Sequence, residues 1–302
     1  MADRSKPVPI IINQGGGSAG DDARERVCAA ITKAGVNARI ILAHGPDCAE
    51  RALQLVKDGA AIVVAAGGDG TMSAVAGALA GTKTAMGVIP LGTLNHLARD
   101  LGIPLDLEEA AVMLAAGTKR KIDVAELNGR VFVNNSAIGL YPLMVMDREA
   151  QQKRLGRSKK LAMLVAALRT LVRFRHQRLS LTVNDQEKRI ETPLLFVGNN
   201  DYRTDIGAAG TRESIADGHL CVMVMRHSNR RGLIAAAIRA LLGRTKNDDM
   251  IRLEGVERLR VDARRQSLTV SLDGEVLSQS TPLDYRIRKH ALTVIAPAAS
   301  KS

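Results

Sequence analysis

The stretch A-I-V-V-A-A-G-G-D-G-T-M, residues 61–72, decides the fold of this 302-residue chain. Residues 61–66 are apolar or small and rich in β-branched side chains, which predicts a strand that is buried on both faces. Residues 67–71 predict a glycine loop, and residues 72–79 predict an alanine-rich helix. A strand, a glycine loop and a helix N-terminus form a phosphate cradle, because the backbone N–H groups of the loop can approach an anion closely.

Asp69 does not suit a simple phosphate cradle, because a carboxylate repels phosphates unless it holds a metal ion or takes a proton. Both are tasks in phosphoryl transfer. An isolated Asp-Gly is more often a tight turn between strands, but the helix predicted after it disfavours a hairpin. The P-loop pattern G-x-x-x-x-G-K-[ST] is absent from the sequence, and so is the dinucleotide pattern G-x-G-x-x-G with a following acid.

Strands alternate with helices on both sides of this stretch, which predicts an α/β domain with a parallel sheet. We expect further strands at 8–12, 39–42 and 85–89, and helices at 21–34, 48–57, 96–101 and 107–116. Two more polar loops follow strands, namely N-Q-G-G-G-S at residues 13–18 and P-L-G-T-L-N at residues 90–95. Because parallel strands end at one edge of their sheet, all three loops should meet where open α/β sheets bind ligands.

From about residue 121 the pattern changes to short strands separated by polar turns, which predicts an antiparallel sandwich or barrel. The expected strands are 122–127, 130–133, 179–183, 194–197, 220–225, 267–272 and 292–295. We therefore expect an α/β domain over residues 1–124 and a mostly antiparallel β-sandwich domain over residues 125–302.

Charge and composition narrow the choice of partners. The net charge of +12 at pH 7 calls for an acidic partner, and nucleotide phosphates and anionic lipid headgroups both qualify. Aromatic residues make up only 2% of the chain, which disfavours stacking on nucleic-acid bases, so no nucleic-acid partner is expected. The three cysteines are scattered without a C-x-x-C, which favours a reduced, cytoplasmic protein. No apolar run approaches the ~20 residues of a transmembrane helix.

Residues 151–178 carry nine Lys or Arg residues, no acidic residue and a set of apolar residues. This pattern predicts a basic amphipathic helix of the kind that lies on anionic membranes. An ordinary surface helix, in which the cations extend their charged ends to water, is an alternative of equal weight.

The pair G-G-D-G-T at 67–71 and P-L-G-T-L-N at 90–95 resembles the diacylglycerol kinase catalytic-domain family, which includes bacterial lipid kinases and the sphingosine and ceramide kinases. A-D-G-H-L at 216–220 resembles the D-G-x-L element of that family, and D-G-E at 273–275 resembles its late D-G-E. These motifs span nearly the whole chain. The resemblance implies an α/β nucleotide domain and a β-sandwich domain with the site in the cleft between them, and a last strand that returns to the first domain.

The resemblance also implies a nucleotide site. ATP phosphates would lie on Gly67, Gly68, Gly70 and Thr71, with Thr93 and Asn95 from the next loop. Asn13 and Ser18 match the first nucleotide loop, which usually reads N-P-x-S-G, and His44 stands where relatives often carry a Thr near the nucleotide.

Two carboxylates compete for the role of base. Glu275 matches the residue usually assigned as proton acceptor in bacterial members, whereas in the sphingosine kinases the role is commonly given to the position of Asp69. A carboxylate suits this role because it can accept the alcohol proton while the alcohol oxygen attacks the γ-phosphorus and Mg²⁺ neutralises the growing charge. Without the resemblance, Asp273-Gly274 would be interpreted as a hairpin turn.

A second metal site is implied further along the chain. Asp217, with Ser214 and His219, matches a structural metal site of bacterial members. Oxygen ligands suit Mg²⁺ or Ca²⁺, and His219 would contribute its carbonyl oxygen rather than its imidazole.

The sequence thus predicts a cytoplasmic lipid kinase, peripheral at the inner membrane face, that uses ATP and Mg²⁺ to phosphorylate a lipid alcohol such as diacylglycerol. One alternative is a soluble-metabolite kinase of the NAD kinase type, although a region of the form T-P-T-G-S-T-A-Y is not found in the sequence. The other is a non-catalytic basic protein that binds membranes or nucleic acid. The sequence leaves open which lipid is the acceptor and whether the chain forms a homodimer.

Overall fold

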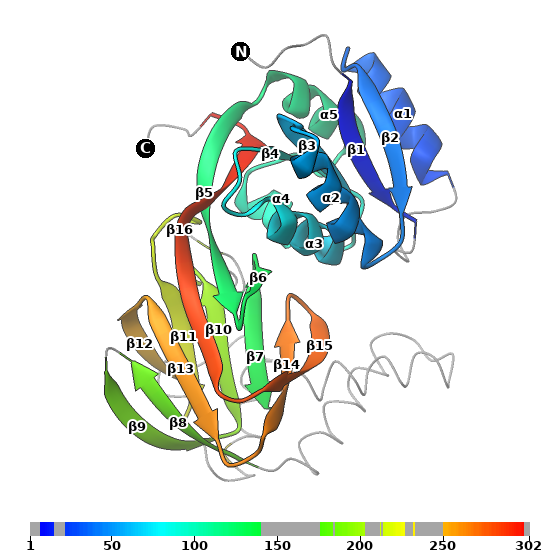
Figure 1. Cartoon of the computed structure of the whole chain (residues 1–302). Helices are drawn as coiled ribbons and strands as arrows, with labels where there is room; N and C mark the ends of the chain where they lie inside the picture. The colour runs from blue at the N-terminus through cyan, green and yellow to red at the C-terminus, as the bar shows by residue number, and fades with distance from the viewer. Residues whose placement is uncertain are drawn as a thin grey trace.

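The computed structural model describes residues 7–14, 22–139, 176–183, 185–202, 212, 214–226, 232 and 250–298. Figure 1 shows an α/β layer made by the N-terminal part of the chain and a β-sandwich made mainly by the later part. Ser18 and almost all of the basic segment 151–178 lie outside the described residues. No helix in the described ranges is long and apolar enough to span a lipid bilayer.

The α/β layer consists of strand–loop–helix units in the order that the sequence predicts. The elements are β1 (Val8–Asn13), α1 (Ala23–Lys33), β2 (Ala38–Ala43), α2 (Asp47–Lys57), β3 (Ile62–Gly67), α3 (Asp69–Leu79), β4 (Ala85–Pro90), α4 (His96–Asp100) and α5 (Leu107–Ala116). The strands lie in the order β2-β1-β3-β4, and each neighbouring pair is parallel. All of their carboxyl ends therefore lie at one edge of the sheet.

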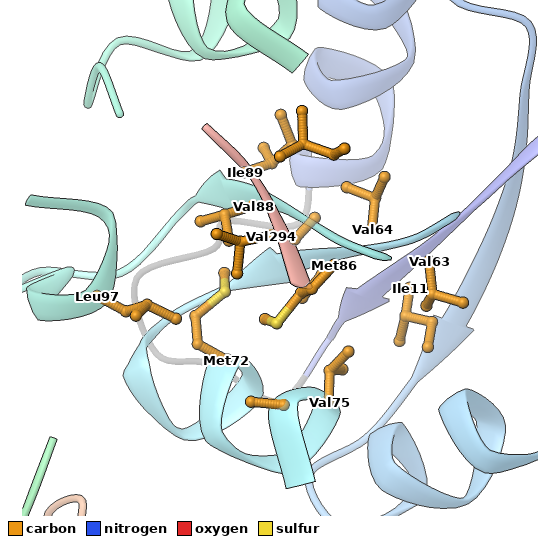
Figure 2. Packing of buried hydrophobic residues seen from close by; sticks show 14 of the residues in the cluster. Ile11, Val63, Val64, Met72, Val75, Met86, Val88, Ile89, Leu97 and Val294 are labelled. Carbon is orange, nitrogen blue, oxygen red and sulfur yellow. The ribbon is translucent and has the colours of Figure 1, made fainter. Parts of the chain in front are cut away.

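The buried core of this layer explains why residues 61–66 are almost all apolar. The strand β3 is buried along nearly its whole length, since helices cover the sheet. Figure 2 shows Val63 of β3 and Met86 of β4 on the face of the sheet where Met72 and Val75 of α3 pack, whereas Val64 points to the opposite face. Small Ala side chains in β3 and α3 allow the helix to lie close to the sheet, so the glycine loop between the two elements is held at both ends.

After α5, the elements that have bounds in the described residues are all strands. These are β5 (Thr118–Leu127), β6 (Arg130–Phe132), β7 (Asn135–Gly139), β8 (Gln177–Val183), β9 (Gln186–Thr192), β10 (Leu194–Asn199), β11 (Leu220–Met225), β12 (Met250–Val256), β13 (Arg258–Ala263), β14 (Ser267–Leu272), β15 (Glu275–Ser280) and β16 (Leu283–Ala296). One sheet has the order β12-β11-β10-β7-β14-β15 and is antiparallel throughout. Buried residues of this sheet, such as Leu195 and Val270, form one core with Leu259 and Tyr285 of the other sheet. The antiparallel sandwich that the sequence predicts is therefore confirmed.

The strand β16 belongs to both layers. Its first half pairs antiparallel with β13, and its last residues pair parallel with β4 through Thr293 and Val294. The strand β5 pairs antiparallel with most of β16, and the register of this pairing shifts between Arg288 and Leu292. The sheet of the α/β layer therefore continues into the sandwich.

Several elements differ from those that the sequence predicts. The helix α3 begins at Asp69, three residues earlier than the expected start at 72, so Asp69 and Thr71 lie in its first turn. The strands β7, β9, β12, β13 and β15 are not anticipated by the sequence pattern. Three of them, β9, β12 and β15, are edge strands of their sheets, and mostly exposed residues give such strands no apolar alternation.

Candidate functional site

The second and third polar loops touch one another at the carboxyl edge of the parallel sheet. The backbone N–H of Leu91 donates to the carbonyl of Gly67, at an N···O distance of 2.9 Å. A Cβ atom added at Gly92 would lie 2.6 Å from the Cα of Gly68, so only glycine allows this approach. The loops G-G-D-G-T and P-L-G-T-L-N therefore form one surface, as the sequence predicts.

Asn13 connects the end of β1 to two other loops. Its side-chain Nδ2 donates to Oγ1 of Thr71 at 2.9 Å, and its Oδ1 accepts the N–H of Gly45 at 3.2 Å. His44, beside Gly45, is exposed at the end of β2. The structure thus brings Asn13 and Thr71 into contact and places His44 in the neighbouring turn.

Asp69 bridges the second loop and the start of α4. Its Oδ1 accepts the backbone N–H of His96 at 2.8 Å, and the residue is half-buried. Its Oδ2 has no hydrogen-bond partner among the residues that the structure describes. A carboxylate that is fixed through one oxygen and open at the other can hold a divalent cation, because Mg²⁺ prefers oxygen ligands of this kind.

Asn95 shapes its own loop. The residue has a positive φ of 52°, and its side chain accepts the N–H of Gly92 at 2.9 Å and donates to the carbonyl of Gly92 at 2.8 Å. Thr93, between them, is exposed. A pocket of about 360 Å³ opens beside this loop and is lined by Pro90, Leu91, Gly92, Thr93, Asn95 and residues at the starts of α1 and α5. The cradle therefore has open space next to its glycines.

The β14–β15 hairpin reaches the same region from the sandwich. Asp273 and Gly274 form its turn with φ values of 48° and 86°, which is the geometry of a two-residue hairpin loop. The turn interpretation of this Asp-Gly is therefore correct in structure. Glu275 follows as the first residue of β15, is exposed, and forms an ion pair with Arg130 at 2.6 Å.

The Asp273 carboxylate is saturated with hydrogen bonds. Its Oδ1 accepts the backbone N–H groups of Asn134 and Asn135 at 2.8 and 2.9 Å. Its Oδ2 accepts the N–H of Val133 at 2.8 Å and the hydroxyl of Ser73. Ser73 lies one turn along α3 from Asp69, and Figure 1 shows the tip of the hairpin directed at this helix. Asp273 therefore holds the hairpin, and with it Glu275, against the helix that begins at the glycine loop.

A buried ion pair forms a second tie between the two layers. Arg212, whose side chain is 0% exposed, donates through Nε to Oδ2 of Asp100 at 2.8 Å. Its Nη1 also donates to the carbonyls of Val133 and Asn199. Burial raises the pKa of the adjacent Tyr202 to about 12, although the positive charge of Arg212 lowers it in part. Sequence reasoning missed this pair because its partners stand 112 positions apart and neither belongs to a motif.

The segment 214–219, predicted as a second metal site, forms hydrogen bonds within itself and with Asn200 and Asp201. The N–H of Asp217 donates to Oδ1 of Asn200, and Ser214 accepts the N–H of Ala216. The imidazole of His219 lies between the Asp217 carbonyl and Asp201. Within the described ranges, no group of three or more His, Cys, Asp or Glu residues could hold a metal ion. Whether backbone oxygens of this segment bind a cation stays a prediction.

Two family models match the chain. Residues 7–127 match the diacylglycerol kinase catalytic domain, and residues 144–296 match the YegS C-terminal NAD kinase beta sandwich-like domain. The second match alone covers half of the chain. Together the two matches follow the α/β layer and the sandwich in order along the chain.

Curated relatives and solved structures agree with these matches. A diacylglycerol kinase of Bacillus subtilis (strain 168) is 29% identical over 239 residues, which cover 77% of this chain and 78% of the relative. A probable lipid kinase YegS-like of Pseudomonas aeruginosa is 30% identical over 245 residues, which cover 80% of this chain and 78% of the relative. The crystal structure of a diacylglycerol kinase from Bacillus anthracis strain Sterne has a TM-score of 0.68 at 19% identity, covers 97% of both chains, and therefore supports the fold alone. On these matches and the two glycine loops, the chain belongs to the family of diacylglycerol kinases and YegS-like lipid kinases.

Proposed function

We propose that this protein is an ATP-dependent lipid kinase that transfers the γ-phosphoryl group to a hydroxyl group of a lipid such as diacylglycerol. The observation that carries the proposal is the arrangement around α3. Two glycine loops and the open oxygen of Asp69 lie at its start, and the hairpin that carries Glu275 is bound to it one turn later. Membership of a kinase family supports the phosphotransferase class.

The glycine loops would hold the nucleotide phosphates. Backbone N–H groups at the start of α3 carry the positive end of the helix dipole, which favours an anion there. Gly70 is exposed, and a Cβ atom added to it would meet nothing within 4 Å, so a phosphate could approach its backbone. Asp69 would hold Mg²⁺ through its open oxygen, together with phosphate oxygens. When bound, Mg²⁺ neutralises the charge that develops on the transferred phosphoryl group.

Glu275 would act as the base. Its exposed carboxylate can accept the proton of the lipid hydroxyl as that oxygen bonds to the γ-phosphorus and the bond from the γ-phosphorus to the bridging oxygen of ADP breaks. Arg130 would keep the carboxylate in one orientation between turnovers. Asp69 is the weaker candidate for this role, because one of its oxygens already accepts the His96 N–H and the other is assigned here to Mg²⁺.

The remaining parts of the proposal concern membrane binding, the domain boundary and a second metal ion. A net charge of +12 favours binding to an anionic membrane surface, so we propose a cytoplasmic enzyme that binds the inner membrane face peripherally. We also propose that the functional division into a nucleotide domain and a lipid-kinase domain falls near residue 124, within β5. A second Mg²⁺ or Ca²⁺ would bind oxygens of the segment that contains Ser214, Asp217 and His219.

The test is phosphate transfer from γ-labelled ATP with Mg²⁺ to a panel of lipids in anionic mixed micelles. We expect label in a lipid with the wild-type chain, almost none with Asp69→Asn, and strongly reduced transfer with Glu275→Gln. Glu254→Gln, which makes the same chemical change at an exposed position of β12, should behave as wild type. Label that enters only soluble acceptors, or wild-type transfer in both site variants, would contradict the proposal.

A further inference from the structure

A strongly basic pocket lies where β13 and β16 run side by side. It has a volume of about 400 Å³ and is lined by Glu257, Arg258, Arg286, Ile287, Arg288 and Lys289. None of these residues belongs to the glycine loops or to the hairpin of Glu275. We call it the β16 pocket.

Two of its arginines are placed in an unfavourable pairing. Arg258 and Arg286 are directly opposite one another on the antiparallel strands β13 and β16. Like charges in this position destabilise a sheet unless something negative lies between them. The guanidinium of Arg258 has no hydrogen bond or ion pair with any residue in the described ranges, although its charge helps to lower the pKa of Glu257.

The acids around the pocket compensate only part of its charge. Glu126, which is buried, pairs with Arg286 at 2.6 Å and with Arg288 at 3.4 Å. Glu257 pairs with Lys289 at 2.6 Å. Four cationic side chains therefore face two carboxylates, which leaves a net charge of +2 on this group.

The pocket is separate from the nucleotide site. The Nη2 of Arg288 donates to the carbonyl of Ala80, which caps the C-terminal end of α3, whereas the glycine loop lies at the other end of that helix. A helix of this length extends about 16 Å. The pocket also lies beside the register shift of β16 between Arg288 and Leu292. Figure 1 shows that β16 runs from the sandwich into the α/β layer.

We propose that the β16 pocket binds a phosphomonoester dianion, either free or as the headgroup of a phosphorylated lipid. A net charge of +2 matches a group that carries close to two negative charges at neutral pH. Arginine forks bind phosphate oxygens in pairs, and the opposed guanidinium groups of Arg258 and Arg286 can both reach one anion between them. The bound anion would remove the repulsion between the strands. This inference does not depend on the kinase activity proposed above.

The first experiment uses inorganic phosphate as the probe. Its binding is measured by calorimetry and by the phosphate-dependent rise in Tm, with saturating ADP present in a parallel series to occupy the glycine loops. Arg258→Ala is compared with Arg260→Ala, which removes the same charge two residues along β13 but lies outside the pocket, next to Asp262 and Asp284. We expect Arg258→Ala to raise the phosphate Kd about tenfold or more, and Arg260→Ala to leave it within about twofold.

A folding control accompanies this measurement. Without phosphate, Arg258→Ala should be at least as stable as the wild type, because it removes a like-charge pair and breaks no described ion pair. With saturating ADP present, its Tm should rise less on addition of phosphate than that of the wild type, since stabilisation by a ligand requires binding to the folded state. Equal phosphate affinity in Arg258→Ala and Arg260→Ala would overturn the proposal.

The second experiment distinguishes the two sources of the anion. Vesicles that contain phosphatidic acid, a phosphomonoester, are compared with vesicles that contain the same fraction of phosphatidylglycerol, a phosphodiester. A preference for phosphatidic acid that Arg258→Ala loses and Arg260→Ala keeps would assign the pocket to a lipid headgroup. Phosphate binding that depends on Arg258, without such a preference, would assign it to a soluble phosphomonoester. Identical behaviour of the two variants in both experiments would show only general attraction between a basic protein and anions.

Discussion

The glycine loop at residues 67–71 and the β14–β15 hairpin both contact helix α3, yet their aspartates have opposite roles. Asp69 fixes one oxygen on the N–H of His96 and leaves the other without a described partner. Asp273 receives three backbone N–H groups and a hydroxyl on its two oxygens. A carboxylate with an open oxygen can bind a ligand, whereas a saturated carboxylate can only hold the fold. Burial and hydrogen bonding, rather than the shared Asp-Gly dipeptide, separate the two roles.

The largest expected effect is that of Asp69→Asn on activity. The amide oxygen of Asn can still accept the His96 N–H, so the free energy of unfolding should change by less than about 1 kcal/mol. The loss of the charge at the open oxygen should lower phosphate transfer by on the order of 100- to 1,000-fold, the range seen when one group that stabilises a transition state is removed. Transfer from γ-labelled ATP and urea denaturation of the same sample measure the two quantities. If the loss of phosphate transfer is accompanied by a large loss in the free energy of unfolding, Asp69 has a structural role instead.

Asp273→Asn should show the reverse pattern. An amide NH₂ group placed among donors leaves at least one of them without an acceptor, so we expect a loss of roughly 2–3 kcal/mol in the free energy of unfolding. Urea denaturation measures it, with Asp262→Asn at a partly exposed position of β13 as the matched control. If Asp273→Asn is as stable as that control, the two aspartates do not differ in the way described.

Ser73→Ala tests the contact between the two regions directly. It removes one hydrogen bond to the Asp273 carboxylate, which costs about 1 kcal/mol, while the higher helix propensity of Ala offsets a few tenths of that in α3. Ser278→Ala, in the exposed strand β15, is the control and should change stability by less than about 0.5 kcal/mol. An unchanged denaturation midpoint for Ser73→Ala would mean that the backbone N–H groups alone hold the hairpin.

The smallest expected effect is on the pH dependence of stability and concerns a third aspartate, Asp201, which forms an ion pair with His219. Burial lowers the pKa of His219, but the hydrogen bond and charge of Asp201 outweigh this and raise it. Burial raises the pKa of Asp201, but His219 and Arg252 outweigh this and lower it. A raised histidine pKa stabilises the fold fully below the unfolded value of about 6.5, and this stabilisation is lost as the pH rises through the folded pKa.

The lowered pKa of Asp201 acts at the other end of the pH range. Its stabilisation is present above the unfolded value and is lost as the pH falls through the folded pKa. Between the two limits the pair contributes fully. Since both side chains are partly exposed, we expect less than about 1 kcal/mol. Urea midpoints between about pH 6 and about pH 9 should fall in the wild type and fall less in His219→Gln. If the urea midpoints of the wild type and His219→Gln change with pH in parallel, the pair of His219 and Asp201 does not contribute to the pH dependence of stability.

The sequence predicts the α/β layer well because the residues that form each strand, loop and helix are neighbours in the chain. Each strand there is an apolar run followed directly by its loop and helix, so the meeting of the glycine loops follows from the parallel order of the strands. The start of α3 is the exception. Gly68 acts as its N-cap in an extended conformation, and the tertiary contacts of Asp69 and Thr71 bring both residues into the first turn.

The junction with the sandwich is less predictable, because its contacts join distant positions. The D-G-E motif draws attention to Glu275, yet nothing in the sequence indicates that Asp273 accepts the N–H groups of residues 133–135 or the hydroxyl of Ser73. Three of the four donors are backbone N–H groups, which every residue except proline carries, so they leave no residue-type signal in the sequence. Likewise, Arg212 and Asp100 form a pair only because the sandwich places one segment against the end of α4.

The path of β16 has a consequence for how the protein is made. The strand β4 can pair with β3 as soon as both have left the ribosome, but its other neighbour, the end of β16, is translated about 200 residues later. At the usual rate of synthesis, ~5–20 residues per second, the edge of β4 waits for tens of seconds or so. An unpaired strand edge can pair with other chains, so we expect the nascent α/β layer to need chaperones until β16 pairs with β4 and covers that edge.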